Sequence, residues 1–234
     1  MPIMTSRISP ATARVAIATL AALLAVSTTA TAQPFSAQLS RRDKDGQIST
    51  GRLAVADDKV RIETPELPNG FFIIRGDARA VYFVQPDHRV FMDARESSIL
   101  TEILVPVDPE APCPQWQAMA EISMSAEGGA AWRCERLGED TFDGRATIRY
   151  GMTSPRGKHY SAWIDPRLRF VVRIEADDGT TTELVDVREG PQPDRAFEIP
   201  AGLRKFDPRQ LIELMKHSDV WVDPAKDAHA EPSK

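Results

Sequence analysis

The chain has 234 residues, of which 34 are acidic and 29 are basic, so its formal net charge is −5. This acidic balance argues against nucleic-acid binding, which depends on a basic face, and we expect no nucleic-acid partner. A chain of this length can fold as one all-β domain with its own core.

The first 32 residues have the pattern of an export signal. Arg7 and Arg14 precede an apolar run over residues 15–26, and small residues follow up to Ala32. A basic start, a short apolar run and an A-x-A end are typical of a signal peptide, whereas a transmembrane helix needs a longer run. We therefore expect a signal peptide at 1–32 that is cleaved after Ala32, a periplasmic location, a single domain over 33–218 and a flexible tail over 219–234.

The mature chain begins with residues whose alternation predicts strands. Segments 35–40, 51–56 and 59–64 alternate apolar and polar side chains. In the hairpin formed by the last two, the apolar side chains share one face, and Arg52, Lys59, Arg61 and Glu63 lie on the other.

The stretch 71–93 predicts a meander of three strands, because two turn signals, Gly76-Asp77 and Pro86-Asp87, separate its apolar runs. In the third run, Val90 and Met92 point to one face. The first two runs, 71–74 and 81–84, are apolar on both faces. One face belongs to the core, and the other must meet a helix, another sheet or a bound apolar molecule.

After Asp93 the apolar period changes and predicts helices at 94–105 and 115–126. Between and beyond them lie the two cysteines of the chain, Cys113 and Cys134. In an exported protein an even count favours a disulfide. The alternative, a reactive or metal-binding pair, is weaker because no C-x-x-C motif accompanies them.

Short strands return in the second half of the chain, at 132–137, 145–150, 158–165, 168–176 and 180–187, and a last helix is expected from Asp207 to Met215. Such regular spacing predicts a partly closed antiparallel sheet. The expected fold class is mainly β (α+β): an incomplete antiparallel β-barrel of about ten strands with helices packed across its open side.

No catalytic or metal-binding motif stands out. The four histidines are scattered and form no H-x-x-x-H or H-E-x-x-H pattern, and G-x-S-x-G, S-x-x-K and phosphate-binding loops are absent. We therefore expect no enzyme activity, no metal and no cofactor.

The remaining signal is a surplus of apolar residues. A curved sheet with helices across its mouth commonly encloses an apolar cavity, and one acyl chain buries enough methylenes to bind without a catalytic group. Each candidate residue for ligand contact can equally be an ordinary residue of the hydrophobic core. The candidates for ligand contact are the inward residues near the meander and the helices: Val90, Met92, Ile99, Ile103, Trp163, Phe170 and Val172.

The order of these segments resembles the LolA-like superfamily of periplasmic lipoprotein carriers, and within it an uncharacterised secreted branch. The most specific parts are Trp163-Ile-Asp-Pro-Arg-Leu-Arg-Phe170 and Phe197-Glu-Ile-Pro-Ala-Gly202, within a resemblance that spans most of 35–215. The resemblance implies an incomplete barrel with a helical lid and a cavity for acyl chains. It also implies that some relatives bind envelope proteins instead. It assigns no site residue.

Two hypotheses follow. The first is a non-catalytic periplasmic binding protein for an acyl chain, lipid or lipoprotein anchor, held in an apolar cavity under a helical lid, with a lipid or an acylated lipoprotein as its partner. The second is an envelope protein-interaction or stress-sensing module with a filled core and a protein partner. In both cases we expect a monomer.

Overall fold

The computed structural model describes residues 32–64, 69–94, 99–123 and 131–207. Their strands form a single twelve-stranded sheet, in the order β12-β6-β5-β4-β3-β2-β1-β11-β10-β9-β8-β7. All neighbours are antiparallel except β12, which runs parallel to β6. The strands are β1 (Phe35–Arg42), β2 (Ile48–Ala56), β3 (Lys59–Glu63), β4 (Phe71–Arg75), β5 (Ala80–Gln85), β6 (Val90–Asp93), β7 (Arg133–Phe142), β8 (Arg145–Thr153), β9 (His159–Asp165), β10 (Phe170–Ala176), β11 (Thr181–Glu189) and β12 (Arg204–Lys205).

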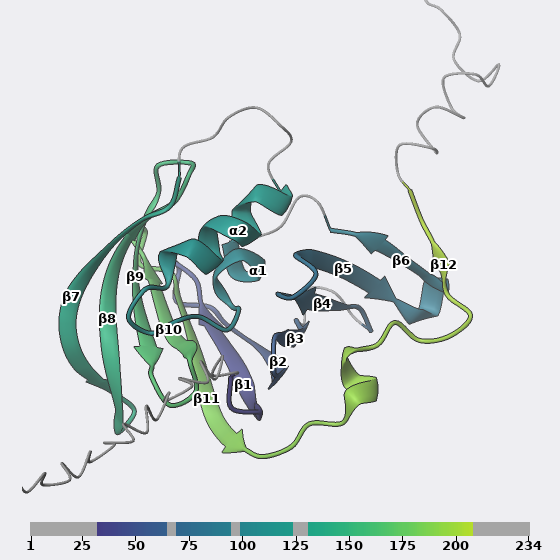
Figure 1. Ribbon diagram of the computed structural model, residues 1–234, viewed down its shortest axis with the longest axis horizontal. Helices are drawn as coiled ribbons and strands as arrows, with labels where there is room; N and C mark the ends of the chain where they lie inside the picture. The colour runs from purple at the N-terminus through teal and green to yellow at the C-terminus, as the bar shows by residue number, and fades with distance from the viewer. Residues whose placement is uncertain (1–31, 65–68, 95–98, 124–130, 208–234) are drawn as a thin grey trace, which may run out of the picture. The chain divides into compact units, whose positions relative to one another are not determined.

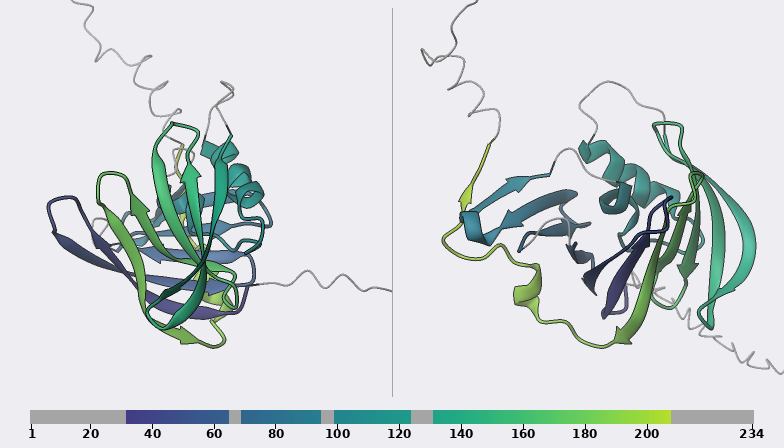
Figure 2. Two further views of the ribbon diagram at one scale, coloured as in Figure 1. Left: turned by 90° about the vertical axis from the view of Figure 1, so that its left-hand side faces the viewer. Right: turned by 180° about the vertical axis from the view of Figure 1, so that it is seen from behind.

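The sheet curls without closing, and the helices lie inside its curve (Figure 1). Its first and last strands, β12 and β7, do not pair with each other, and Figure 2 shows the long strands β7 to β11 arching away from the shorter strands β4 to β6. The predicted class, a mainly β incomplete antiparallel barrel with helices packed against it, is confirmed. The sheet has twelve strands rather than about ten.

Turn residues set the hairpins where the sequence places them. Between β7 and β8, Asp143 and Gly144 both have positive φ, 49° and 72°. These values are typical of a type I′ turn, whose twist suits a tight hairpin. Asp57, with φ 52°, plays the corresponding part between β2 and β3.

Both predicted helices are present over the described residues. α1 (Ile99–Ile103) ends before Pro106, and α2 (Cys113–Ser123) begins two residues earlier than expected. Pro114 lies in the first turn of α2, where its missing N–H costs no helical hydrogen bond. Two 3-10 turns complete the elements, η1 (Pro86–His88) and η2 (Asp194–Phe197).

The main core fills the space between the helices and the concave face of the sheet. Trp116 from α2 and Ile103 from α1 are fully buried, and they belong to the same apolar cluster as Phe35, Val55 and Phe170 from the sheet. The concave face is therefore covered by side chains of the two helices.

A second, smaller apolar cluster shows what covers the second apolar face of strands β4 and β5. Phe71, Ile73 and Val84 are buried on the outer face, where Ile199 and Leu203 pack over them. These two residues belong to the C-terminal crossing segment, residues 190–206, which runs from β11 across to β12 (Figure 1). The cover of this face is therefore the chain itself.

Several predictions fall on residues outside the described ranges. The proposed signal peptide falls there up to residue 31, as do the last helix from residue 208 onward and the tail at 219–234. Among the described residues, no helix has the length and apolar character needed to cross a membrane.

Candidate functional site

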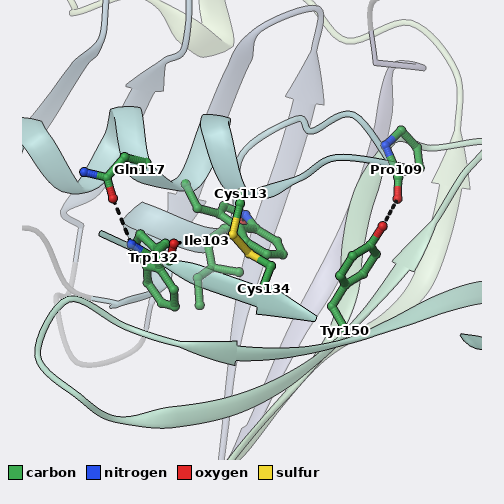
Figure 3. The surroundings of a disulfide bond; sticks show 8 residues. Ile103, Pro109, Cys113, Gln117, Trp132, Cys134 and Tyr150 are labelled. Carbon is green, nitrogen blue, oxygen red and sulfur yellow. Dashed lines mark hydrogen bonds between the residues drawn. A yellow bond between two sulfur atoms is a disulfide. The ribbon is translucent and has the colours of Figure 1, made fainter. Parts of the chain in front are cut away.

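The predicted disulfide is present and ties α2 to the sheet. Cys113, the first residue of α2, is bonded to Cys134 in β7, and their Cα atoms are 6.0 Å apart. Beside it, the Gln117 side chain accepts a hydrogen bond from the Trp132 backbone N–H at 2.9 Å (Figure 3). The start of α2 is thus attached to the edge of the sheet by a covalent bond and a hydrogen bond.

Polar groups under the helices are satisfied within the protein. Trp116 donates its indole N–H to the backbone oxygen of Ile103 at 3.1 Å, which joins α2 to α1. Tyr150 in β8 donates its hydroxyl to the backbone oxygen of Pro109 at 2.9 Å, which joins the sheet to the loop before α2 (Figure 3). Burial raises the pKa of Tyr150 above its usual value, so the hydroxyl keeps its proton at neutral pH.

Four of the predicted ligand-contact residues belong to the main buried cluster, Ile103, Trp163, Phe170 and Val172. The Phe170 ring packs edge-on against Phe35 at 5.3 Å between centroids. Their surroundings are side chains of the same protein. A role in ligand contact for these residues stays a prediction.

Met92 and Val90 lie at the other end of the sheet, in β6, and both are only half-buried. Met92 is paired with Phe83, which is paired with Phe72, so these three side chains share one face. Ile99 is the first residue of α1, and its side chain lies outside what the structure describes.

Trp163 also belongs to the main cluster, as a buried residue of β9. Its paired neighbours on β8 and β10 are Arg149 and Arg173. The guanidinium groups of both arginines contact the Trp163 ring, with Arg149 at 4.8 Å and Arg173 at 5.0 Å from its centroid.

The indole N–H of Trp163 also has a hydrogen-bond partner. It donates to the Asp140 carboxylate at 2.8 Å. This hydrogen bond is the main cause of an Asp140 pKa below its usual value. Trp163 thus anchors a cation–π arrangement with two arginines, and a role for it in ligand contact stays a prediction.

An open groove of about 1070 Å³ lies over β1, β2 and β3, and none of its lining residues comes from the helices. We call it the outer groove. Its floor is formed by residues of β1, β2 and β3. The last part of β11, the crossing segment, η1 and the described residues Thr64, Asn69 and Gly70 complete its lining. It is lined by Ser36, Ala37, Gln38, Thr50, Gly51, Arg52, Leu53, Ala54, Arg61, Glu63, Thr64, Asn69, Gly70, Phe71, Pro86, Asp87, Asp186, Arg188, Gln192, Pro193 and Ala196.

A partly buried carboxylate with two arginine partners organises the groove floor. Glu63 accepts hydrogen bonds from Arg61 Nε and Arg52 Nε, both at 2.8 Å. Burial alone would raise the pKa of Glu63, but the two arginines outweigh it and the pKa lies below the usual 4.5. The guanidinium carbon of Arg61 also lies over the Phe71 ring, 3.4 Å from its centroid. Arg61 donates a further hydrogen bond to the backbone oxygen of Ala196 at 3.1 Å.

A smaller cleft of about 210 Å³ lies between the helices and the β8–β9 turn, with Glu102, Ser154 and Tyr160 in its wall. Ser154 is occupied locally, because its hydroxyl accepts the Lys158 backbone N–H at 3.1 Å. Within the described ranges, no cluster of three or more His, Cys, Asp or Glu side chains could hold a metal ion.

Sequence reasoning placed Arg52, Arg61 and Glu63 on an outer face but did not see a groove there. The missing information was the pairing of β1 with β11, which brings Asp186 and Arg188 beside them, and the path of the crossing segment. Neither leaves a signal in the local sequence.

No family model and no curated protein sequence matches the chain. Among solved structures, an uncharacterised conserved protein from Thermus thermophilus is 11% identical with a TM-score of 0.46, over 75% of this chain and 90% of that one. MucB in the Pseudomonas aeruginosa MucA/MucB complex is 11% identical with a TM-score of 0.42, over 74% of this chain and 57% of its own.

An outer membrane lipoprotein-sorting protein domain from Vibrio parahaemolyticus is 11% identical with a TM-score of 0.36, over 71% of this chain and 89% of its own. At such scores the likeness is a remote one in fold, and it establishes neither a family nor a shared function.

Proposed function

We propose that this protein is an exported, non-catalytic binding protein that acts through a protein partner in the cell envelope, with a filled interior. This is the second of the two hypotheses drawn from the sequence. The observation that carries it is the packing under the helices. Trp116, Ile103 and Leu104, each 0% or 1% exposed, occupy the space where an acyl chain would lie.

The disulfide supports the same proposal. To admit an acyl chain, α1 and α2 would have to leave the concave face. The Cys113–Cys134 bond holds the start of α2 to β7, and the Trp116–Ile103 hydrogen bond holds the helices to each other. A disulfide is also typical of proteins outside the cytosol, which agrees with export to the periplasm.

Acyl-chain binding remains the second candidate, and one observation favours it. The row of paired residues Leu53, Ile62, Phe72, Phe83 and Met92 runs across five strands of the concave face. The last three are only half-buried. An acyl chain laid along this end of the row would be held by apolar contact at about 0.8 kcal/mol per buried methylene.

A titration with a fluorescent long-chain fatty acid separates the two candidates. The proposed function predicts no saturable uptake by the mature, disulfide-bonded protein at one site per molecule. Saturable one-to-one uptake that is lost when Phe83 is replaced by Asp would establish the lipid-binding candidate instead. Phe91→Asp, on the opposite face of the neighbouring strand, serves as the matched control.

A further inference from the structure

The outer groove runs across the strands rather than along them. Ser36 is paired with Arg188 of β11 and with Ala54 of β2, and Ala54 is paired with Arg61 of β3. These side chains therefore form a row from β11 to β3, and Phe71 at the start of β4 lies at its far end. Four strand spacings of about 4.8 Å make this row about 19 Å long.

This shape fits a segment of a polymer better than a small molecule. Small-molecule sites are concave, largely apolar and bury most of their ligand, whereas this groove is open and its floor carries Arg52, Arg61 and Glu63. An extended polypeptide advances about 3.3 Å per residue, so a length of about 19 Å accommodates about six residues.

The charge of the groove points to polypeptide rather than to a uniformly charged polymer. Three arginines and three acidic residues line it, so it has no net charge, and a polyanion would gain little from it. Phe71 is the only aromatic residue among its lining. That ring is 5% exposed and is capped by Arg61, so no ring face is open for stacking on a sugar.

Amide side chains provide the polar partners that a peptide backbone needs. Gln38 lies on the floor, in β1, and Asn69 and Gln192 also line the groove. The Asn69 side-chain NH₂ group donates a hydrogen bond to the Asp87 carboxylate at 2.7 Å. The Gln192 side-chain NH₂ group donates one to the Gly190 backbone oxygen at 2.9 Å. No hydrogen bond between the amide oxygens of these two side chains and another described residue is present, so both oxygens can accept N–H groups from a ligand.

Two arginine side chains at the outer groove can pair with an acidic group of a ligand. The Arg52 side chain is 81% exposed although it contacts Glu63, and Arg188 is exposed and forms no ion pair with any described residue. A β-bulge lies between the Ser36 and Gln38 pairings with β11, where Asp186 has φ 53°. Bulges of this kind are frequent beside binding sites because they redirect side chains.

We propose that the outer groove binds an extended segment of about six residues from a polypeptide partner, and that acidic side chains of this segment pair with Arg52 and Arg188. This inference rests on the proposed function, since it names the site and the partner's chemistry. Because β1 to β3 are paired on both edges, the segment lies across the sheet through side-chain contacts and does not add a strand to it.

The test uses the mature protein, with its disulfide intact, and a phage-displayed library of random heptapeptides. Enriched sequences are synthesised with fluorescein, and their binding is measured by anisotropy. We expect enrichment of peptides that contain Asp or Glu. We expect about five- to tenfold weaker binding to the double variant Arg52→Gln, Arg188→Gln, because each exposed ion pair contributes little by itself.

Controls separate the groove from the rest of the surface. Arg42→Gln, at the far exposed end of β1, should leave the affinity unchanged, whereas Gln38→Trp, which fills the floor, should abolish binding. Equal binding to the wild type, the double variant and Gln38→Trp would overturn the groove as the site but leave a protein-binding function standing. No enriched peptide, together with one-to-one uptake of fatty acid, would overturn the proposed function itself.

Discussion

Trp116→Ala tests the filled interior most sharply among single substitutions. The Trp116 side chain is fully buried between α2, α1 and the sheet. Burial of about 200 Å² of aromatic surface at about 25 cal/mol per Å² corresponds to about 5 kcal/mol, and measured Trp-to-Ala losses in cores are about 3–5 kcal/mol. We expect the free energy of unfolding to fall by about 4 kcal/mol.

The assay is urea unfolding followed by circular dichroism, which does not depend on the missing indole. Trp116→Phe is the matched control. It keeps most of the apolar area and loses only the hydrogen bond to the Ile103 oxygen, so it should cost about 1–3 kcal/mol. A loss below about 1.5 kcal/mol for Trp116→Ala would refute the reasoning, because it would mean that the space around this ring is not closely packed.

Three further predictions concern the covalent bond, a carboxylate and a glycine. The double variant Cys113→Ser, Cys134→Ser should have a free energy of unfolding lower by about 3 kcal/mol, since the disulfide closes a loop with a sequence separation of 21. If reduction of the wild-type disulfide left the midpoint of urea unfolding unchanged, this prediction would be contradicted. Glu63→Gln should lower stability at pH 7, and the difference should vanish in acid. The native pKa of Glu63 lies below 4.5, so its stabilising effect is present above that pH and is lost as the pH falls through the native value; pH-dependent melting curves of the two proteins provide the check. Gly51→Ala should lower the free energy of unfolding by about 1–3 kcal/mol, because its Cβ would collide with the Glu63 backbone oxygen. Gly151→Ala is the control and should be close to neutral, because its Cβ would have an ordinary contact at 3.6 Å. Similar losses of stability for both variants would be evidence against the close approach of Gly51 to Glu63.

Much of the fold follows from local sequence. The meander of β4, β5 and β6 and the β7–β8 hairpin are predictable because Gly76-Asp77, Pro86-Asp87 and Asp143-Gly144 mark turns between apolar runs. The disulfide follows from the even cysteine count and the expected export. The turns depend on a few neighbouring residues, and the disulfide depends on export from the cytosol, which the signal-peptide pattern predicts.

Features that depend on distant pairing were not predictable. β9 is buried over four consecutive residues, from Ala162 to Asp165, so alternation alone cannot show which face Trp163 occupies. Likewise, the doubly apolar strand β4 left a helix, another sheet or a bound apolar molecule as possible covers of its second face, whereas Ile199 and Leu203 from the crossing segment cover it. The outer groove has the same origin, because β1 joins β11 only in three dimensions.

Native mass spectrometry with lipid extraction, applied to the mature protein purified from its own periplasm, tests the central claim most directly. That claim is that the interior under α1 and α2 is filled by the protein's own side chains. The account predicts the mass of the unliganded, disulfide-bonded chain and no acyl-containing extract at stoichiometric level. A one-to-one acyl adduct that survives transfer to the gas phase would contradict it and would identify the protein as a lipid carrier.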